Sequence, residues 1–211
     1  MKIGIMVAMD KEYERIEALH SSDIILCKSG IGKVNAAAAA TRMILEHRPD
    51  CIISTGCAGG LAPGLKVMDV VVGAQTCYHD ADCGEGFEPG QIMGMPARFE
   101  ADAALYAKAI GLSARAGSRI LGGLICTGDV FCTEREQTDA ILSRFPDAAA
   151  VDMESAAIAQ VCHIYEVPFI SFRIVSDSAG DDKARISEYR DFWSELAERS
   201  FGIFKQFIET L

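Results

Sequence analysis

No apolar stretch in the sequence is long enough to cross a membrane. A spanning helix needs about 20 consecutive apolar residues, and glycine, proline or charged residues interrupt each apolar run before that length. The N-terminal apolar run, residues 3–9, ends at Asp10, Lys11 and Glu12 and lacks the form of a targeting segment. We therefore expect a soluble protein in which residues 2–8 form the first strand.

The chain is also poor in positive charge. It has 20 Lys and Arg against 30 Asp and Glu, which gives a formal net charge of −10 at pH 7. Phosphate backbones and acidic lipid headgroups are not attracted to such a surface. We expect neither a nucleic acid nor a membrane as a partner, and a neutral or cationic small molecule as the ligand.

The cysteines lack the spacing of a zinc site. There are eight of them but no Cys-x-x-Cys pair, and no second cluster accompanies the possible ligands Cys77, His79, Asp80, Asp82 and Cys83. The cysteines lie in apolar strand-like and helix-like runs, where a free thiol behaves as a small hydrophobic group. We expect buried free thiols in a reducing cytoplasm, and no bound metal.

Two glycine-rich loops also lack the known nucleotide-binding motifs. Residues 28–33 have neither the wide glycine spacing and final Lys-Ser/Thr pair of a P-loop nor a complete G-x-G-x-x-G. They precede an alanine-rich helical pattern, so their backbone N–H groups could face a ligand oxygen. The second loop, residues 55–60, is either a tight turn that needs a positive φ at glycine or a place where the backbone approaches a ligand closely, and two such loops beside acidic strand ends favour the close approach.

What the chain has is a regular alternation of strand and helix patterns. Helices are expected at residues 10–19, 34–46, 101–110, 134–145, 153–165 and 186–211, the last of them either continuous or broken, with apolar runs typical of strands between the helices. This alternation predicts an α/β sandwich with a central, partly parallel sheet. A chain of 211 residues that is 50% hydrophobic fits a single domain over residues 1–211.

Carboxylates follow the predicted strands. A small apolar run ends at Asp152 and Glu154 where a helix begins, and the run over residues 169–176 ends at Asp177. Ligands of open α/β sheets bind outside the carboxyl ends of strands, so Glu154 and Asp177 should face one crevice. Glu12 also follows a strand, although the helix dipole alone favours an acid in a first turn. Phe131, after another strand, either stacks on a flat ligand or belongs to the core.

Residues 84–96 are rich in Gly, Pro and Met and show no periodicity, which predicts a long surface loop. The loop carries the apolar residues Phe87, Ile92, Met93 and Met95, which a solvated loop would not favour. We expect it to cover a ligand or an interface, the alternative being that these side chains fold back onto their own core.

Six motifs taken together resemble one enzyme family. They are residues 3–12, 28–34, 55–60, 78–82, 151–154 and 173–177, in this order over nearly the whole chain. The chain is similar to the 5′-methylthioadenosine/S-adenosylhomocysteine nucleosidases of the nucleoside phosphorylase superfamily. The resemblance implies a three-layer α/β/α sandwich with a mixed, twisted sheet. It also implies a homodimer that hydrolyses the N-glycosidic bond of 5′-thio-substituted adenosines and releases adenine without a cofactor.

By position in the motifs, the resemblance also implies roles for individual residues. Glu12 matches the base that orders the attacking water, Arg173 the arginine near that water, and Asp177, helped by Ser176, the acid serving the purine. Met153 and Glu154 match the ribose-binding pair. The other implied substrate contacts are Met9, Ile31, Cys57, Gly59, Phe131, Cys132 and Asp152, together with Phe87 over the 5′ group. Between Glu12 and Gly30 the chain is shorter than the family by about a hairpin.

Two other functions compete with hydrolysis. A phosphorylase of the same superfamily would need basic groups for phosphate, and the candidates are Lys28, Lys33 and Arg173. A non-catalytic nucleoside-binding protein would keep the pocket without turnover. A departing purine needs a proton and a developing ribosyl cation is stabilised by carboxylates, so the acidic residues favour the hydrolase.

Overall fold

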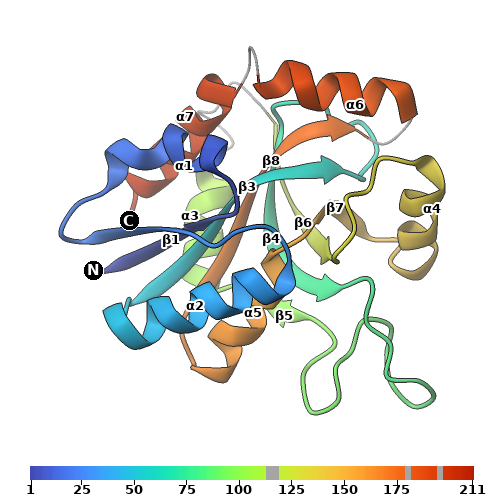
Figure 1. Cartoon of the computed structure of the whole chain (residues 1–211), viewed down its shortest axis with the longest axis horizontal. Helices are drawn as coiled ribbons and strands as arrows, with labels where there is room; N and C mark the ends of the chain where they lie inside the picture. Colours follow the sequence, from blue (N-terminus) through green and yellow to red (C-terminus); the bar gives the residue numbers. More distant parts are fainter. Residues whose placement is uncertain (113–118, 179–181, 194–196) are drawn as a thin grey trace.

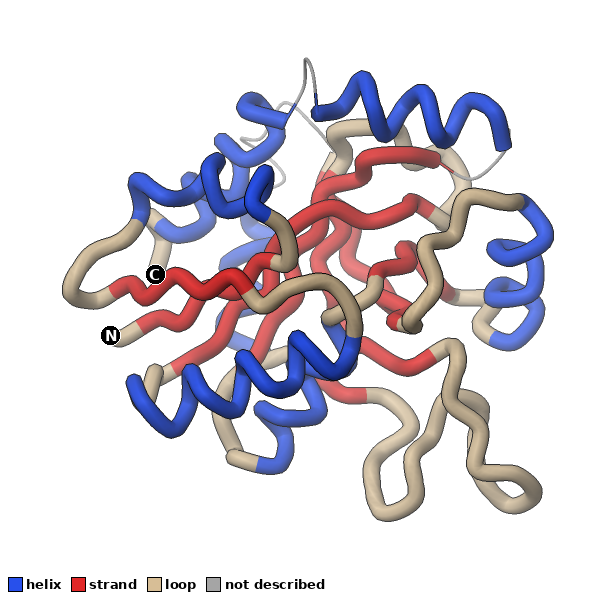
Figure 2. Tube along the Cα trace, viewed as in Figure 1, coloured by secondary structure: helices blue, strands red, loops and turns tan. Residues whose placement is uncertain are grey.

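The computed structural model describes residues 1–112, 119–178, 182–193 and 197–211. In this part of the chain, an eight-stranded mixed sheet lies between two layers of helices, as the alternating pattern predicted (Figure 1). The sheet twists through the centre of the molecule, and the helices lie on both of its faces (Figure 2). The strands are β1 (Ile3–Val7), β2 (Ile24–Lys28), β3 (Cys51–Gly60), β4 (Val70–Tyr78), β5 (Phe99–Glu100), β6 (Ile120–Thr127), β7 (Ala148–Asp152) and β8 (Phe169–Ser178).

Five of the strands close into a ring. β3 pairs with β8 in parallel, β8 with β4 antiparallel, β4 with β6 and β6 with β7 in parallel. β7 then returns to β3, where Gly59 and Gly60 pair with Val151 and Ala150. β1 and β2 extend the sheet from β3 in parallel. The closure brings the ends of β3, β7 and β8 to one place.

Residues 55–60 are the second half of β3, so the prediction of a loop there was wrong. Thr55 to Gly60 pair with β8 from Phe172 to Ser178, with one irregularity after Ala58. The small residues that suggested a loop instead allow close packing, because a Cβ on Gly60 would lie 3.0 Å from Cγ1 of Val175. A glycine-rich segment indicates that another group packs close to the backbone, and here that group is the neighbouring strand β8.

The helices divide into two layers. Ile16, Leu105 and Phe204 belong to the core on one face of the sheet, where Phe172 also stacks on Phe207 with ring centroids 5.4 Å apart. Ala40 and Ile158 belong to the core on the other face. The helices are α1 (Asp10–Ile16), α2 (Lys33–His47), α3 (Ala103–Gly111), α4 (Arg135–Arg144), α5 (Ser155–Ile164), α6 (Asp182–Asp191) and α7 (Ala197–Ile208), with a 3-10 turn η1 (Glu17–Leu19) after α1. For the terminal helix predicted over residues 186–211, either continuous or broken, the structure describes α6 and α7, and α6 begins earlier than expected, at Asp182.

A long loop without helix or strand joins β4 to β5 at the lower right of Figure 2, as predicted for residues 84–96. Ile92 and Met95 pack against the core that α2 and α5 form with the sheet. These two side chains therefore fold back onto their own chain, as the alternative prediction had it. Met93, by contrast, is 69% exposed. The apolar residues of the loop thus divide into two groups, and only some of them face outward.

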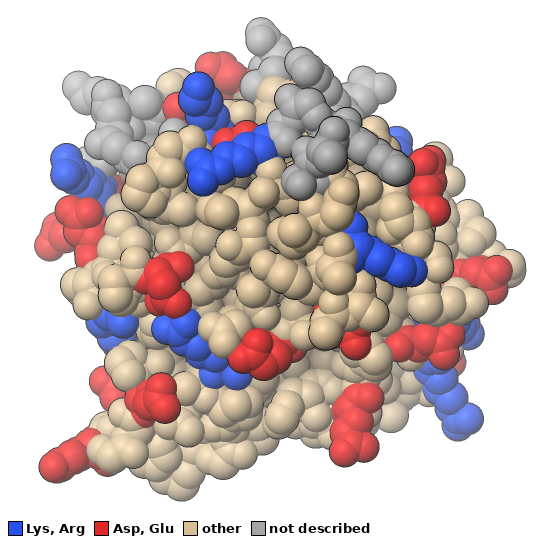
Figure 3. Space-filling view, turned by 180° about the vertical axis from the view of Figure 1, so that it is seen from behind, with Lys and Arg blue, Asp and Glu red and all other residues tan. Residues whose placement is uncertain are grey.

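None of the eight cysteines, all of which lie in the described ranges, forms a disulfide bond, and Cys27, Cys57 and Cys83 are only partly buried. No helix in the described ranges is long and apolar enough to span a bilayer. On the face drawn in Figure 3, basic side chains lie scattered among acidic ones. That face carries no broad basic area among the residues described.

Candidate functional site

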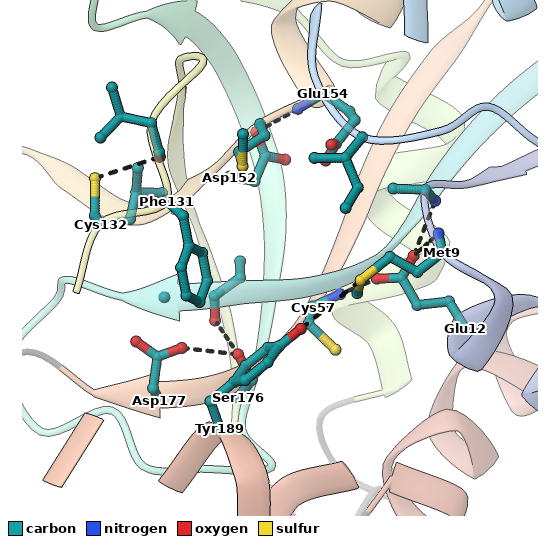
Figure 4. Close-up of a pocket in the computed structure, with 17 residues that line it drawn as sticks. Met9, Glu12, Cys57, Phe131, Cys132, Asp152, Glu154, Ser176, Asp177 and Tyr189 are labelled. Atoms are coloured by element: carbon teal, nitrogen blue, oxygen red, sulfur yellow. Dashed lines mark hydrogen bonds between the residues drawn. The ribbon is translucent and has the colours of Figure 1, made fainter. Parts of the chain in front are cut away.

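A pocket of about 320 Å³ opens where β1, β3, β7 and β8 end (Figure 4). It contains most of the residues singled out in the sequence, namely Met9, Glu12, Ile31, Cys57, Gly59, Phe131, Cys132, Asp152, Met153, Glu154, Ser176 and Asp177. Arg173 and Phe87 do not line it. Glu12 and Asp177 lie on opposite sides of the pocket in Figure 4, with Glu154 between them at the top.

Glu12 is held by three backbone N–H groups. Its Oε2 accepts hydrogen bonds from the nitrogens of Ala8 (2.8 Å) and Met9 (2.9 Å), and its Oε1 accepts one from Cys57 (3.0 Å). Burial raises the pKa of Glu12, and the nearby Arg173 and these hydrogen bonds oppose the rise. The result is a fixed carboxylate whose proton affinity is shifted toward that of a general base.

Gly56 makes room for this carboxylate. A Cβ at position 56 would lie 2.7 Å from Nη1 of Arg173 and closer still to Oε1 of Glu12, and the residue has a φ of +145°. Glu12 and Arg173 can approach β3 only because no side chain stands there. The sequence did signal this position through its glycine motif, but the approaching groups belong to the protein and not to a ligand.

Arg173 lies behind the pocket and is 1% exposed. Its Nε is 2.8 Å from Oδ2 of Asp152, and its Nη2 donates to Oγ of Ser54 (2.8 Å) and Ser155 (3.0 Å). The guanidinium also lies next to Glu12, because Nη1 of Arg173 and Oε1 of Glu12 both border the space that a side chain at Gly56 would fill. Its expected place beside an attacking water stays a prediction. Side chains alternate across a strand, and this one points into the buried layer behind Glu12.

Asp152 lines the pocket, but its carboxylate is engaged within the protein. Besides Arg173, its partners are the Thr127 hydroxyl (2.6 Å), the Ser155 hydroxyl, and the backbone N–H groups of Glu154 (3.3 Å) and Ser155 (3.2 Å). These bonds fix the turn from β7 into α5. Asp152 therefore orients Met153 and Glu154, and the substrate contact expected of it stays a prediction.

Glu154 is tied to the beginning of α2. Its Oε1 accepts a hydrogen bond of 2.9 Å from the N–H of Gly32, and the residue is 6% exposed. Burial raises the pKa of Glu154 to about 7; Arg173 opposes this rise and Asp152 adds to it. One carboxylate oxygen is thus held by the protein beside the cavity.

Asp177 faces the other side of the pocket beside an aromatic pair. Ser176 Oγ donates to Asp177 Oδ1 at 2.8 Å, and Asp177 is 5% exposed. Phe131 is 55% exposed and lines the pocket, so it is not a core residue. Its ring lies 5.4 Å from that of Tyr189, whose hydroxyl donates to Sδ of Met9 at 3.7 Å. This wall can hold a flat ring.

Tyr189 is a pocket residue that sequence reasoning did not settle. The family resemblance implies an aromatic residue after Asp177, and the sequence leaves open whether Ile186 or Tyr189 takes its place. The structure places Tyr189 in the pocket. The side chain of Ile186 lies outside the described residues. Helix spacing alone does not say which side of α6 faces the cavity.

The basic residues considered for phosphate all have carboxylate partners. Lys28 pairs with Asp10, and Nζ of Lys33 lies 2.7 Å from Asp80. Arg173 is bound to Asp152 behind the pocket as described above. No Lys or Arg is among the described residues that line the cavity, and the described part of the chain holds no group of three or more possible metal ligands. The arrangement suits acid and base chemistry by carboxylates on a neutral ligand.

Known proteins resemble the chain over its whole length. The model of the phosphorylase superfamily matches residues 12–209. A 5′-methylthioadenosine/S-adenosylhomocysteine nucleosidase of Actinobacillus succinogenes is 40% identical in an alignment of 220 positions that covers 95% of each chain. A nucleosidase of the same name from Haemophilus influenzae is 38% identical in an alignment of 231 positions that covers all of both chains. The crystal structure of the Neisseria meningitidis nucleosidase with methylthio-immucillin-A is 38% identical, with a TM-score of 0.93 over 100% of this chain and 99% of that one.

Proposed function

Because the chain belongs to the 5′-methylthioadenosine/S-adenosylhomocysteine nucleosidases of the phosphorylase superfamily, we propose that its pocket hydrolyses the N-glycosidic bond of 5′-thio-substituted adenosines and releases adenine. One observation favours hydrolysis over phosphorolysis. Four carboxylates, those of Glu12, Asp152, Glu154 and Asp177, line the cavity, and no cationic side chain accompanies them among the described lining residues. A phosphate dianion would find no cationic side chain to bind it among these lining residues, whereas neutral water needs none.

In the proposed reaction, Asp177 gives a proton to the imidazole nitrogen of the purine as the bond to C1′ breaks. Glu12 orients a water molecule and takes its proton while the water oxygen bonds to C1′. Glu154 binds the ribose hydroxyls, and its negative charge stabilises the ribosyl cation that develops. Phe131 and Tyr189 hold the purine plane, and Ser176 orients the Asp177 carboxyl group.

The direct test is incubation with methylthioadenosine in buffers with and without phosphate. We expect adenine and free methylthioribose in phosphate-free buffer, at a rate that phosphate does not increase. Product identification by mass spectrometry distinguishes the alternatives. A ribose 1-phosphate product that forms only with phosphate would identify a phosphorylase, and binding without any turnover would identify a non-catalytic nucleoside-binding protein.

The protein is also proposed to act as a homodimer in which the loop at residues 84–96 covers the 5′ end of the partner's ligand. Ile31 and Phe131 at the pocket are 51% and 55% exposed, so the cavity has an apolar rim. Phe87 lies outside the pocket of its own chain, and Met93 is 69% exposed. Apolar groups that stay exposed in one chain are typical of a contact with another.

Mixing two inactive proteins tests the shared site. Asp177→Asn subunits keep the loop, and Phe87→Ala/Met93→Ala subunits keep the acid, so each heterodimer should contain one intact pocket and regain activity. Sedimentation at the assay concentration should show a dimer. Subunit exchange without recovered activity, or a monomer in sedimentation, would contradict the proposal.

A further inference from the structure

Lys33, Asp80 and Asp129 form a charged network beside the pocket that has no part in the reaction described above. Nζ of Lys33 lies 2.7 Å from both carboxylate oxygens of Asp80 and 3.8 Å from Oδ2 of Asp129. The backbone N–H of Lys33 donates to Oδ1 of Asp129 (2.8 Å), and the N–H of Asp129 donates to Oδ2 of Asp80 (2.9 Å). Each of the three residues is therefore bonded to both of the others.

The network joins three segments that are far apart in sequence. Lys33 begins α2, Asp80 follows β4, and Asp129 follows β6. Pocket residues lie directly beside two of them. Ile31 and Gly32 precede Lys33, and Gly32 donates to Glu154. The pocket residues Val130, Phe131 and Cys132 follow Asp129.

We propose that Lys33 and Asp80 are positioning residues for substrate binding, which hold the start of α2 and the segment 129–132 in the geometry that the nucleoside needs. The proposal rests on the proposed function, because Glu154 is the ribose ligand and Phe131 the purine contact in that scheme. Neither Lys33 nor Asp80 lines the cavity, so both act through their neighbours.

The charge of Lys33 is what keeps the network together. The side chains of Lys33 and Asp80 are 25% and 24% exposed, and the Tyr78 ring lies 5.5 Å from Nζ of Lys33. Partial burial raises the pKa of Asp80, but the hydrogen bonds from Lys33 and from the N–H of Asp129 outweigh it and leave the pKa below its ordinary value. Without the ammonium group, the carboxylates of Asp80 and Asp129 would repel each other, and segment 129–132 would move away from α2.

This assignment also accounts for two sequence features that the reaction leaves unused. Asp80 was considered as a metal ligand, and Lys33 as a phosphate ligand. Each is the other's ion-pair partner, with both oxygens of Asp80 facing the lysine. Asp80 also accepts a hydrogen bond from the N–H of Asp129, and Asp129 accepts one from the N–H of Lys33, so the pair has a defined geometry, unlike a single exposed ion pair.

Lys33→Met removes the charge and keeps the length of the side chain. We expect KM for methylthioadenosine to rise about tenfold while kcat stays within about threefold, because the lost contacts are made in the ground state and the transition state alike. Asp80→Asn should act in the same direction. Lys33→Arg should restore most of the affinity, since a guanidinium can also bind both oxygens of Asp80.

Arg98→Met is the matched control. It removes another cation from an aspartate, Asp147, to which Arg98 donates at 2.5 and 3.1 Å, and no pocket residue lies within three positions of either residue. Its KM should equal that of the parent. An unchanged KM in folded Lys33→Met and Asp80→Asn proteins, or an equal rise in Arg98→Met, would overturn the proposal. A Lys33→Met protein with a lower kcat and an unchanged KM would also overturn the proposal.

An error in the proposed reaction can be distinguished from an error in the positioning role of Lys33 and Asp80. If the parent protein does not hydrolyse methylthioadenosine, the reaction is wrong whatever the variants do. The positioning role is then measured by calorimetric titration with adenine, which should bind about tenfold more weakly to Lys33→Met than to the parent and to Arg98→Met. Equal adenine affinities in all three proteins would overturn the positioning role by itself.

Discussion

Replacing Asp177 by asparagine is expected to lower kcat for methylthioadenosine by about 10²-fold or more, while adenine still binds. The amide has nearly the same shape, and its oxygen can still accept the 2.8 Å hydrogen bond from Ser176 Oγ. It cannot release a proton to the purine, so the adenine anion becomes a poor leaving group. The loss should therefore fall on kcat and much less on KM.

Steady-state kinetics with adenine detection measure the effect of Asp177→Asn, and calorimetry measures binding. Asp139→Asn is a suitable control, because Asp139 is an exposed residue of α4 whose ion pair with Arg135 (3.5 Å) lies on the surface. The control should retain parental kinetics. Turnover of Asp177→Asn at the parental rate would show that another group protonates the purine.

Replacing Glu12 by glutamine should lower kcat at least as strongly, by about 10²-fold or more. The glutamine lacks the basic oxygen that takes the proton from water. It also conflicts with its surroundings, since both oxygens of Glu12 accept N–H bonds from the backbone of Ala8, Met9 and Cys57. The NH2 group must therefore face a backbone N–H on one side, which leaves two donors opposed.

The pH dependence separates the chemical effect of Glu12→Gln from the structural one. Because burial raises the pKa of Glu12, the base should lose its charge, and kcat/KM should fall, at a higher pH than for an exposed glutamate near about 4.3. Activity is present above this pKa and is lost as the pH falls through it. The residual activity of Glu12→Gln should lack the decline that belongs to Glu12 and keep only that of Glu154, whose charge the reaction also needs.

Melting temperature and adenine affinity show whether the Glu12→Gln protein keeps its fold and pocket. An acid limb that persists unchanged in the variant would belong to another carboxylate. Glu154 is the first candidate, because burial raises its pKa to about 7. Such a limb is compatible with Glu12 as the base, and the assignment would be contradicted by a parental kcat in folded Glu12→Gln.

The fold class and the position of the site were accessible from local patterns. Alternating strand and helix periodicity predicted the α/β layers, and acids after strands placed Glu154 and Asp177 in one crevice. Both inferences depend on properties of short segments, namely the periodicity of apolar residues and the point where a strand ends. The six motifs, read in order, identified the family, which the matched relatives confirm.

The partners of the charged residues depended on tertiary structure. Nothing near Arg173 in sequence shows that it binds Asp152 behind the pocket, or that Lys33 meets Asp80 and Asp129. These contacts arise because β7 closes onto β3 and β6 lies between β4 and β7, which sets the register of segments many residues apart. A strand pattern shows that side chains alternate between two faces, but only the pairing of strands decides which charges meet. The sequence by itself therefore determined which chemical groups the site contains, and the tertiary structure decided which of them face the ligand and which hold the others in place.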